Sequence, residues 1–354
     1  MHSKTLVDEL PVFWMVDDIE VCATLTRPPG EGPFPALIFV AGSGPTDRNW
    51  NSPLIPGTNG SGALLARELT EAGFITLRYD KRASGPHVAE NVPRMIGKIS
   101  MKSHVEELAG GVSLLAGRDD VNAAQLFVLT NSEGCVHALN YQTQADGPLF
   151  AGMVLTSAFA RSTGALARSQ IAAQIAAVPD GDALLATYDA AMAAFVAGRP
   201  VPTDETLPEW LRQLIQAITL PANQPFAREL WAFDPTVKLA GITTPVLIVL
   251  GKKDIQVDWQ TDGVTFEAVA EEHDNITVSY AENANHVLKF EPKPRSQLIP
   301  TEVMVTYGAD DVLLDPEPVE TITSWLQAQL QRSRNRVSPK KLGFSPVAEG
   351  KQRS

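Results

Sequence analysis

The sequence predicts an α/β fold in which a mostly parallel central sheet is flanked by helices and carries one inserted helical cap. Short apolar runs alternate with longer amphipathic segments, as they do in a parallel sheet whose strands are joined by helices. Several of these runs end in clusters of small or polar residues, at the carboxyl ends where such sheets place their sites. The alternation stops between residues 161 and 233, where the chain is Ala-rich and helical.

The predicted strands are short apolar stretches bounded by turn-forming residues. The first two, 11–16 and 20–26, flank Asp17 and Asp18, which predicts an antiparallel hairpin. The other predicted strands are 36–40, 74–79, 125–130, 153–156, 245–250, 276–280 and 303–307.

Helices are predicted where apolar residues recur at spacings of three or four. One covers 61–72 and is closed by Gly73 as its C-cap. A second covers 103–116, another begins near Cys135, and a last one over 316–331 has a single apolar face. We therefore expect a core domain of residues 1–160 and 234–331, with residues 161–233 inserted as a cap.

Composition and charge narrow the function classes. Of the 354 residues, 44% are hydrophobic and 20% are charged, which is ordinary for a globular protein. The net charge of −12 disfavours nucleic acid and anionic membrane surfaces as partners. Residues 332–354 carry seven Lys and Arg against one Glu, so we expect a disordered basic tail there, with a basic interaction segment as the alternative.

The two cysteines, Cys22 and Cys135, form neither a disulfide framework nor a zinc motif. No stretch reaches 18 apolar residues, and the N-terminus has no apolar run of signal length. A cytoplasmic location is therefore the expectation. The chain is also compatible with assembly into a homo-oligomer.

The sharpest local signal is the segment 126–134, an apolar strand followed by Thr130-Asn131-Ser132-Glu133-Gly134. A strand that turns abruptly into a helix exposes the residue at the turn, and the G-x-S-x-G pattern places a nucleophilic serine there. Gly134 fits that pattern, whereas Thr130 replaces its first glycine. The alternative is that Ser132 merely caps a helix.

A nucleophilic serine needs a base, and the base needs an acid that orients it. Asp254 follows the strand 245–250, and His286 follows the strand 276–280, in the chain order Ser, Asp, His. The other histidines lack a preceding strand with a small polar loop; they are His2, His87, His104, His137 and His273. Asp258 and the pair Asp310-Asp311 compete for the role of acid, but Asp258 belongs to a helix start and the pair follows His286.

The same chemistry needs donors for the oxyanion, and two backbone N–H groups suffice. Glu133, directly after Ser132, offers one at a helix N-terminus. The loop after the strand 36–40 offers the second, from Ser43 or, as the alternative, from Gly44. An ordinary Gly-rich turn explains that loop equally well, and nucleotide binding is disfavoured because neither G-x-G-x-x-G nor GK[ST] follows.

These motifs together resemble the α/β-hydrolase superfamily, in particular its bacterial esterase-like members and relatives of the prolyl-oligopeptidase and dienelactone-hydrolase groups. The resemblance covers about residues 33–331 apart from the cap. It rests on GSGPTDRN at 42–49, RYDKRASG at 78–85, SEG at 132–134, the loop 251–254 and Asn285-His286. In this group His is frequent where Asn131 stands, and Asp80 and Arg82 are expected to brace loops through an ion pair and hydrogen bonds.

The resemblance implies a serine hydrolase in which Ser132, His286 and Asp254 act on a small-molecule ester with a small or medium acyl group. Amide, peptide or lactone cleavage by the same residues is the alternative, and a non-catalytic binding protein of the same fold is a further one. No metal and no organic cofactor is expected. The apolar residues of the cap predict an apolar acyl or alcohol pocket.

Overall fold

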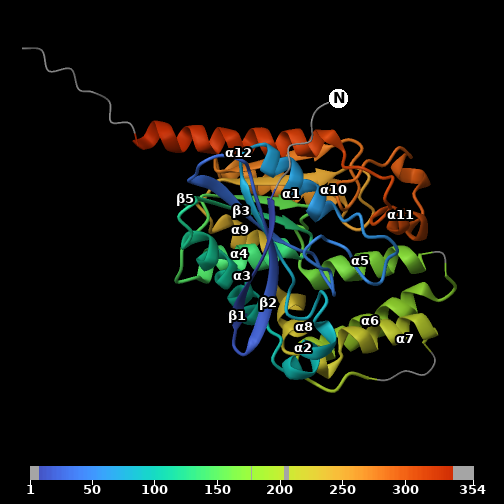
Figure 1. Ribbon diagram of the computed structural model, residues 1–354. Coiled ribbons are helices and arrows are strands. Elements are labelled where there is room, and N and C mark those ends of the chain that lie inside the picture. Colours follow the sequence, from blue (N-terminus) through green and yellow to red (C-terminus); the bar gives the residue numbers. More distant parts are fainter. Residues whose placement is uncertain (1–7, 177, 203–206, 338–354) are drawn as a thin grey trace, which may run out of the picture.

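The computed structural model describes residues 8–176, 178–202 and 207–337. An eight-stranded sheet runs through the molecule in the order β1-β2-β4-β3-β5-β6-β7-β8 (Figure 1). The strands are β1 (Asp8–Val16), β2 (Ile19–Arg27), β3 (Phe34–Val40), β4 (Ile75–Tyr79), β5 (Val121–Asn131), β6 (Gly152–Thr156), β7 (Val246–Gly251) and β8 (Ile276–Ala281). β1 pairs with β2 and β2 with β4 in antiparallel fashion, and every later pair is parallel. The predicted hairpin and the mostly parallel sheet are confirmed.

The central strands are apolar throughout because both faces of the sheet are covered. In β3, Ala36, Ile38 and Val40 belong to one hydrophobic cluster, whereas Leu37 and Phe39 belong to another. Successive side chains of a strand point to opposite faces, so each strand contributes to both clusters. This burial fixes the register and therefore the level at which the strands end.

Two layers of helices enclose the sheet (Figure 1). α3 and α4 pack against each other and supply Leu108, Val112 and Leu139 to the first cluster. α1 and α12 cover the opposite face, where Leu65 and Ile322 join the second cluster. The helices outside the insertion are α1 (Ser61–Glu71), α2 (Val88–Met95), α3 (Met101–Ala116), α4 (Gly134–Gln144), α9 (Pro235–Ala240), α10 (Trp259–Glu272), α11 (Pro300–Thr306) and α12 (Pro316–Val337), with a 3₁₀ turn at Arg295–Gln297.

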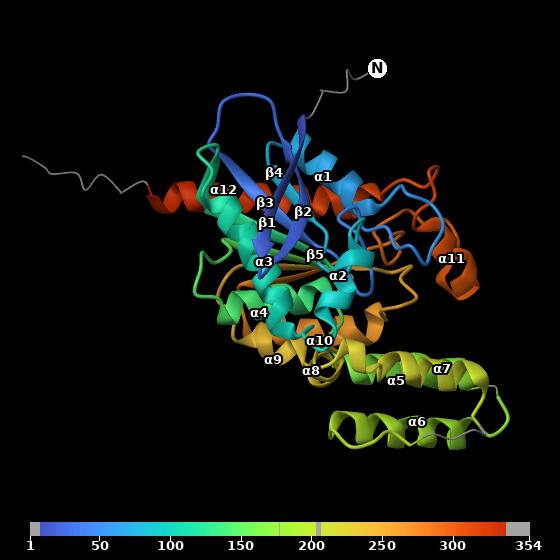
Figure 2. The same cartoon turned by 60° about the horizontal axis from the view of Figure 1, so that its bottom comes forward.

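Four of the five α-helices between β6 and β7 lie in the segment 161–233 expected to be a cap. They are α5 (Thr163–Ile175), α6 (Gly181–Val196), α7 (Glu209–Ile218) and α8 (Phe226–Ala232), with a 3₁₀ turn at Pro221–Asn223. They share a small hydrophobic cluster of their own, which includes Ile171, Tyr188 and Leu211. Figure 2 shows α6 and α7 extending away from the sheet, whereas α8 contacts α3 of the core.

Two expectations about the C-terminal part are corrected. Residues 303–307 form no strand: 303–306 belong to α11, in which Pro300 occupies the first turn, and Tyr307 is the C-cap. Val303 and Tyr307, four positions apart, pack in one hydrophobic cluster. α12 continues to Val337, so residues 332–337 of the expected tail are helical, as its good helix formers allow. The rest of that tail, 338–354, lies outside the described residues. Within the described ranges no helix has the length and apolarity that crossing a membrane requires.

Candidate active site

Ser132 stands at an abrupt turn between β5 and α4, the segment 130–134, which we call the elbow. Its φ of +51° lies in the left-handed region, where a residue other than glycine is strained. Gly134 permits this turn because a Cβ at that position would overlap the carbonyl oxygen of Val40 and lie 2.9 Å from that of Ala41. The sequence pattern therefore identified a real constraint at Gly134.

Thr130 occupies the first glycine position of the pattern without disrupting the elbow. It lies fully buried in β5, opposite Val40 of β3 and Leu155 of β6. Its Oγ1 donates to the carbonyl of Val154 at 3.4 Å, and its own carbonyl accepts from Thr156 Oγ1 at 2.6 Å. The β-branched side chain is thus accommodated as an ordinary strand residue.

Asp254 and His286 meet beyond the carboxyl ends of β7 and β8. His286 Nδ1 lies 2.7 Å from Asp254 Oδ2, and the two residues are 6% and 2% exposed, respectively. The other carboxylate oxygen, Oδ1, accepts from the backbone N–H groups of Gln256 at 2.7 Å and Val257 at 3.0 Å. One oxygen fixes the acid loop, so the other remains available to orient the imidazole.

The competing carboxylates are placed elsewhere by the structure. Asp258 is the N-cap of α10 and accepts from Thr261 Oγ1 at 2.7 Å. Asp310 and Asp311 are exposed after α11. Of the candidates, Asp254 is the one that the structure brings to His286.

The backbone of His286 is held from two sides. Its carbonyl oxygen accepts from Ser157 Oγ at 2.6 Å and from Asn131 Nδ2 at 3.0 Å. Ser157, which follows β6, also has a left-handed φ of +49°. Sequence reasoning missed both roles, since Asn131 stood out only as a departure from the family pattern and nothing marked Ser157.

Tyr307 packs beside the imidazole of His286, with ring centroids 6.3 Å apart and an interplanar angle of 25°. Its hydroxyl accepts from Gln256 Nε2 at 3.0 Å. Burial, and then the charge of Asp254, raise the pKa of Tyr307 above its ordinary value. A neutral phenol therefore bridges the base and the acid loop, another role that sequence reasoning missed.

Ser132 and His286 line the same two cavities. The larger, of about 240 Å³, also includes Ser43, Leu54 and Met304. The smaller, of about 170 Å³, shares Ser43, Ser132 and His286 with it, and extends under α5 to Phe159 and Leu166. The predicted nucleophile and base thus border a common space that runs in two directions, with the larger cavity mainly apolar and the smaller one mixed in polarity.

Three sequence-predicted oxyanion candidates lie around this space. Ser43 and Gly44 line the larger cavity, and Ser43 and Glu133 line the smaller. Among the described residues, none of their three backbone N–H groups donates to a protein acceptor outside the regular helix and strand bonds. The loop 42–44 lies against the elbow, because a Cβ on Gly42 would come within 3.4 Å of Ser132 Cβ.

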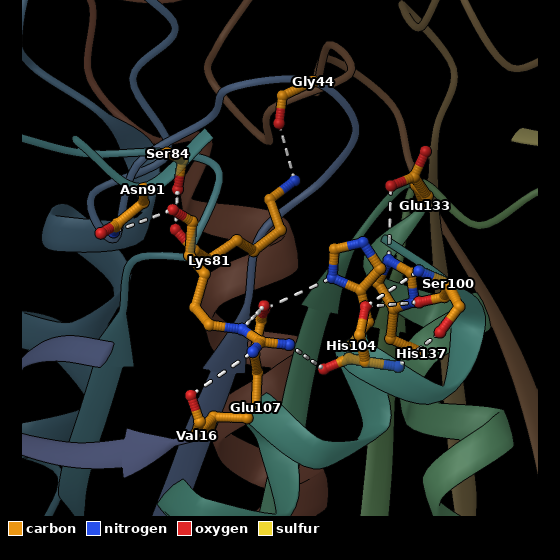
Figure 3. A network of polar contacts seen from close by, with 12 residues as sticks. Val16, Gly44, Lys81, Ser84, Asn91, Ser100, His104, Glu107, Glu133 and His137 are labelled. Atoms are coloured by element: carbon orange, nitrogen blue, oxygen red, sulfur yellow. Dashed lines mark hydrogen bonds and ion pairs between the residues drawn. The ribbon is translucent and has the colours of Figure 1, made fainter. Parts of the chain in front are cut away.

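Glu133 belongs to a buried polar network that also includes His137 and His104 (Figure 3). Glu133 Oε1 lies 3.3 Å from His137 Nε2, and the His137 ring packs on that of His104 with centroids 4.4 Å apart. Burial disfavours ionisation of Glu133, but the His137 hydrogen bond and the Lys81 charge outweigh it and lower the pKa of Glu133 to about 2. Burial, and then His104, lower the pKa of His137 to about 4.

Asp80 and Arg82 brace loops through ion pairs and hydrogen bonds, as expected, but they do not pair with each other. Asp80 pairs with Arg48 instead, accepting from its Nη2 at 2.5 Å, and Arg82 donates from Nε to Glu107 at 2.9 Å. The two residues lie two positions apart in the loop after β4, and their side chains face different neighbours. Each nevertheless braces a loop: Asp80 joins the loops after β3 and β4, and Arg82 joins the β4 loop to α3 and, through Asp17, to the first hairpin.

Comparisons with known proteins agree with this architecture. No family model matches the chain. Esterase EstD of Thermotoga maritima is 24% identical over 268 residues, which cover 75% of this chain and 57% of that esterase, so the chain spans little more than half of its relative's length.

Solved structures add three likenesses. The 2,6-dihydroxy-pseudo-oxynicotine hydrolase superposes with a TM-score of 0.53 and 15% identity, covering 92% of this chain and 69% of that one. The proline iminopeptidase of Mycobacterium smegmatis gives a TM-score of 0.53 at 14% identity, with 92% and 100% covered. An esterase of Pyrococcus furiosus gives 0.51 at 16% identity, with 92% and 90% covered. With its sheet order and its strand-to-helix turn at Ser132, the chain therefore has the α/β-hydrolase fold.

Proposed function

We propose that this chain is a serine esterase that cleaves a small-molecule carboxylic ester through an acyl-enzyme intermediate. The observation that carries the proposal is the 2.7 Å hydrogen bond between His286 and Asp254, together with the cavity that His286 shares with the strained Ser132. The likeness to Esterase EstD supports the choice of an ester as substrate.

The first half of the reaction forms the acyl-enzyme. Because Nδ1 of His286 is bonded to Asp254, Nε2 is the ring nitrogen that takes the proton of Ser132 Oγ as that oxygen attacks the ester carbonyl carbon. The carbonyl π electrons move to the oxygen, and the N–H groups of Ser43 and Glu133 donate to this oxyanion. Collapse expels the alkoxide, which leaves as an alcohol with the proton from Nε2.

The second half returns the enzyme to its starting state. Water attacks the acyl carbon and gives its proton to His286 Nε2, and the second tetrahedral oxyanion occupies the same donors. Its collapse breaks the bond to Ser132 Oγ, which recovers the proton from Nε2 as the carboxylic acid leaves. Asp254 stabilises the imidazolium in both halves and is not itself protonated.

The two cavities match a substrate whose acyl and alcohol groups are both of modest size. They meet at Ser132 and His286, so the acyl and alcohol groups of one ester can leave the reacting carbon in different directions. Cavities of about 240 and 170 Å³ hold short or medium chains. This size supports a small or medium acyl group.

Steady-state hydrolysis of p-nitrophenyl acetate, butyrate and octanoate tests the proposal, with p-nitroanilides of the same acids as the amide comparison. We expect turnover of the esters, with little activity on the anilides, and none in Ser132→Ala. Ser113→Ala, which changes an exposed serine on α3, is the matched control and should keep wild-type rates. Ester hydrolysis that persists in Ser132→Ala contradicts the assignment, and faster anilide hydrolysis replaces the esterase with an amidase.

A cytoplasmic location is also a proposal. It is supported by Cys22 and Cys135, both of which are free thiols. Fractionation of the source cells with an antibody to the protein tests it, and recovery outside the cytoplasmic fraction contradicts it.

A further inference from the structure

Lys81 directs its charged end into the protein. It follows β4 and is 4% exposed, and its Nζ donates to the carbonyl oxygens of Gly42 at 2.5 Å and Gly44 at 2.8 Å. Figure 3 shows the side chain reaching the carbonyl of Gly44. A buried ammonium requires compensating partners. Here two of them flank Ser43, a candidate oxyanion donor.

These bonds determine which way the Gly42–Ser43 peptide faces. The peptide is trans, so the N–H of Ser43 points opposite to the carbonyl of Gly42. Because that carbonyl is held by Lys81, the N–H of Ser43 points away from Lys81, on a loop that lies against the elbow. The Gly44 carbonyl precedes Pro45, which has no N–H, so this second bond fixes the loop without orienting a donor.

Glu133 makes the positive charge of Lys81 relevant to the reaction. Its backbone N–H follows Ser132 directly, whereas its carboxylate is buried and bonded to His137. A buried negative charge beside the elbow opposes the negative charge that develops on the substrate. Lys81 and Glu133 line one cavity, so the positive charge of Lys81 lies near the carboxylate and offsets this repulsion.

We propose that Lys81 is a positioning residue for the oxyanion hole, which orients the Ser43 N–H through the Gly42 carbonyl and offsets the charge of Glu133. This inference rests on the proposed esterase function. Lys81 acts without touching the reacting atoms, since it lines neither of the two cavities that contain Ser132. It lines a separate cavity of about 400 Å³ under α7 and α8.

The test is Lys81→Met, a change of similar length without charge, assayed on p-nitrophenyl butyrate. We expect kcat to fall about 10- to 100-fold with KM within about threefold, because a misdirected oxyanion donor affects the transition state more than the bound ester. Lys102→Met, an exposed lysine of α3, is the matched control and should retain wild-type kcat. Lys81→Arg keeps the charge, and the 400 Å³ cavity gives its longer side chain room, so it should recover part of the loss.

The double variant Lys81→Met/Glu133→Gln isolates the role of the charge. With the carboxylate removed and the backbone N–H kept, we expect it to be faster than Lys81→Met. A wild-type kcat in Lys81→Met overturns the proposal, and so does a double variant no faster than the single one. If the wild-type protein itself does not hydrolyse the ester, the proposed esterase function is overturned instead.

If Lys81→Met does not fold, alkaline titration removes the charge without a substitution. Burial lowers the pKa of Lys81, and the carboxylates of Glu133 and Glu107 partly offset this; His104 and His137 are the other titratable groups of this network. We expect kcat of the wild-type protein to fall at alkaline pH and the midpoint of that fall to rise in Lys81→Arg. Identical alkaline limbs in the two proteins overturn the proposal.

Discussion

Asn131, the residue directly before Ser132, donates from Nδ2 to the carbonyl oxygen of His286 at 3.0 Å. This bond ties the proposed nucleophile to the loop of the proposed base, across segments more than a hundred residues apart in the sequence. Ser157 donates to the same oxygen from the next strand end, so the base loop is anchored to both β5 and β6.

Asn131→Ala removes this link and leaves the Asp254 contact intact. A single hydrogen bond contributes about 1 kcal/mol, so we expect kcat to fall about fivefold when the base loses its fixed position. Steady-state kinetics on p-nitrophenyl butyrate measures the effect. Asn122→Ala, outside both cavities, is the control, and equal kinetics in the two variants would contradict the role of Asn131.

Asp254→Asn should disturb the orientation of the His286 imidazole while leaving the loop after β7 folded. The Asn carbonyl can still accept from Gln256 and Val257, but its amide faces His286 Nδ1 and favours the wrong tautomer. We expect kcat to fall by about 10⁴. Thermal unfolding should change little, and a variant with normal turnover would remove Asp254 from the mechanism.

His286→Ala deletes the base itself. Removal of the base from a comparable triad lowers kcat by about a million-fold, and we expect a loss of that order here. The cavity gains space rather than losing it, so ester binding should persist. Turnover near the wild-type rate would require a different base.

Gly134→Ala tests the close approach of α4 to β3. The added Cβ would overlap the Val40 carbonyl, which is backbone and cannot move aside, so we expect the free energy of unfolding to fall by about 2 kcal/mol or more. Gly241→Ala is the matched control, because its Cβ would lie 3.5 Å from its nearest neighbour at a φ of −83°. Equal urea midpoints for the two variants would contradict this account of the elbow.

The Glu133–His137 pair predicts loss of stability in acid. The pKa of His137 is lowered to about 4 from 6.5, so between these values the unfolded chain takes up a proton that the folded chain does not. The pKa of Glu133 is lowered to about 2 from 4.5, which extends the loss to lower pH. The free energy of unfolding in urea should therefore be lower at pH 5 than at pH 7, with a smaller difference in His137→Gln.

The sheet, the chain order of the candidate residues and the elbow could be predicted because each leaves a local pattern. Continuous apolar runs mark strands covered on both faces, and Gly134 marks a close backbone approach. Residues 303–307 misled the prediction because a short apolar run has no distinct period. Pro300 was the available signal for a helix there.

The supports of the site could not be predicted, because they depend on pairs distant in sequence. Nothing near Ser157 indicates that it holds His286, and the partners of Asp80 and Arg82 lie on segments that only the folded chain brings together. From the sequence alone, Lys81 is likewise expected to be an ordinary charged loop residue, because its hydrogen bond to Gly42 appears only in the folded chain.

Mass spectrometry after reaction with a fluorophosphonate tests the central claim most directly. We predict one phosphonyl adduct on the peptide that contains Ser132, absent in Ser132→Ala and formed much more slowly in His286→Ala. An adduct on another residue, or labelling unchanged by either substitution, would contradict the assignment of Ser132 as the nucleophile.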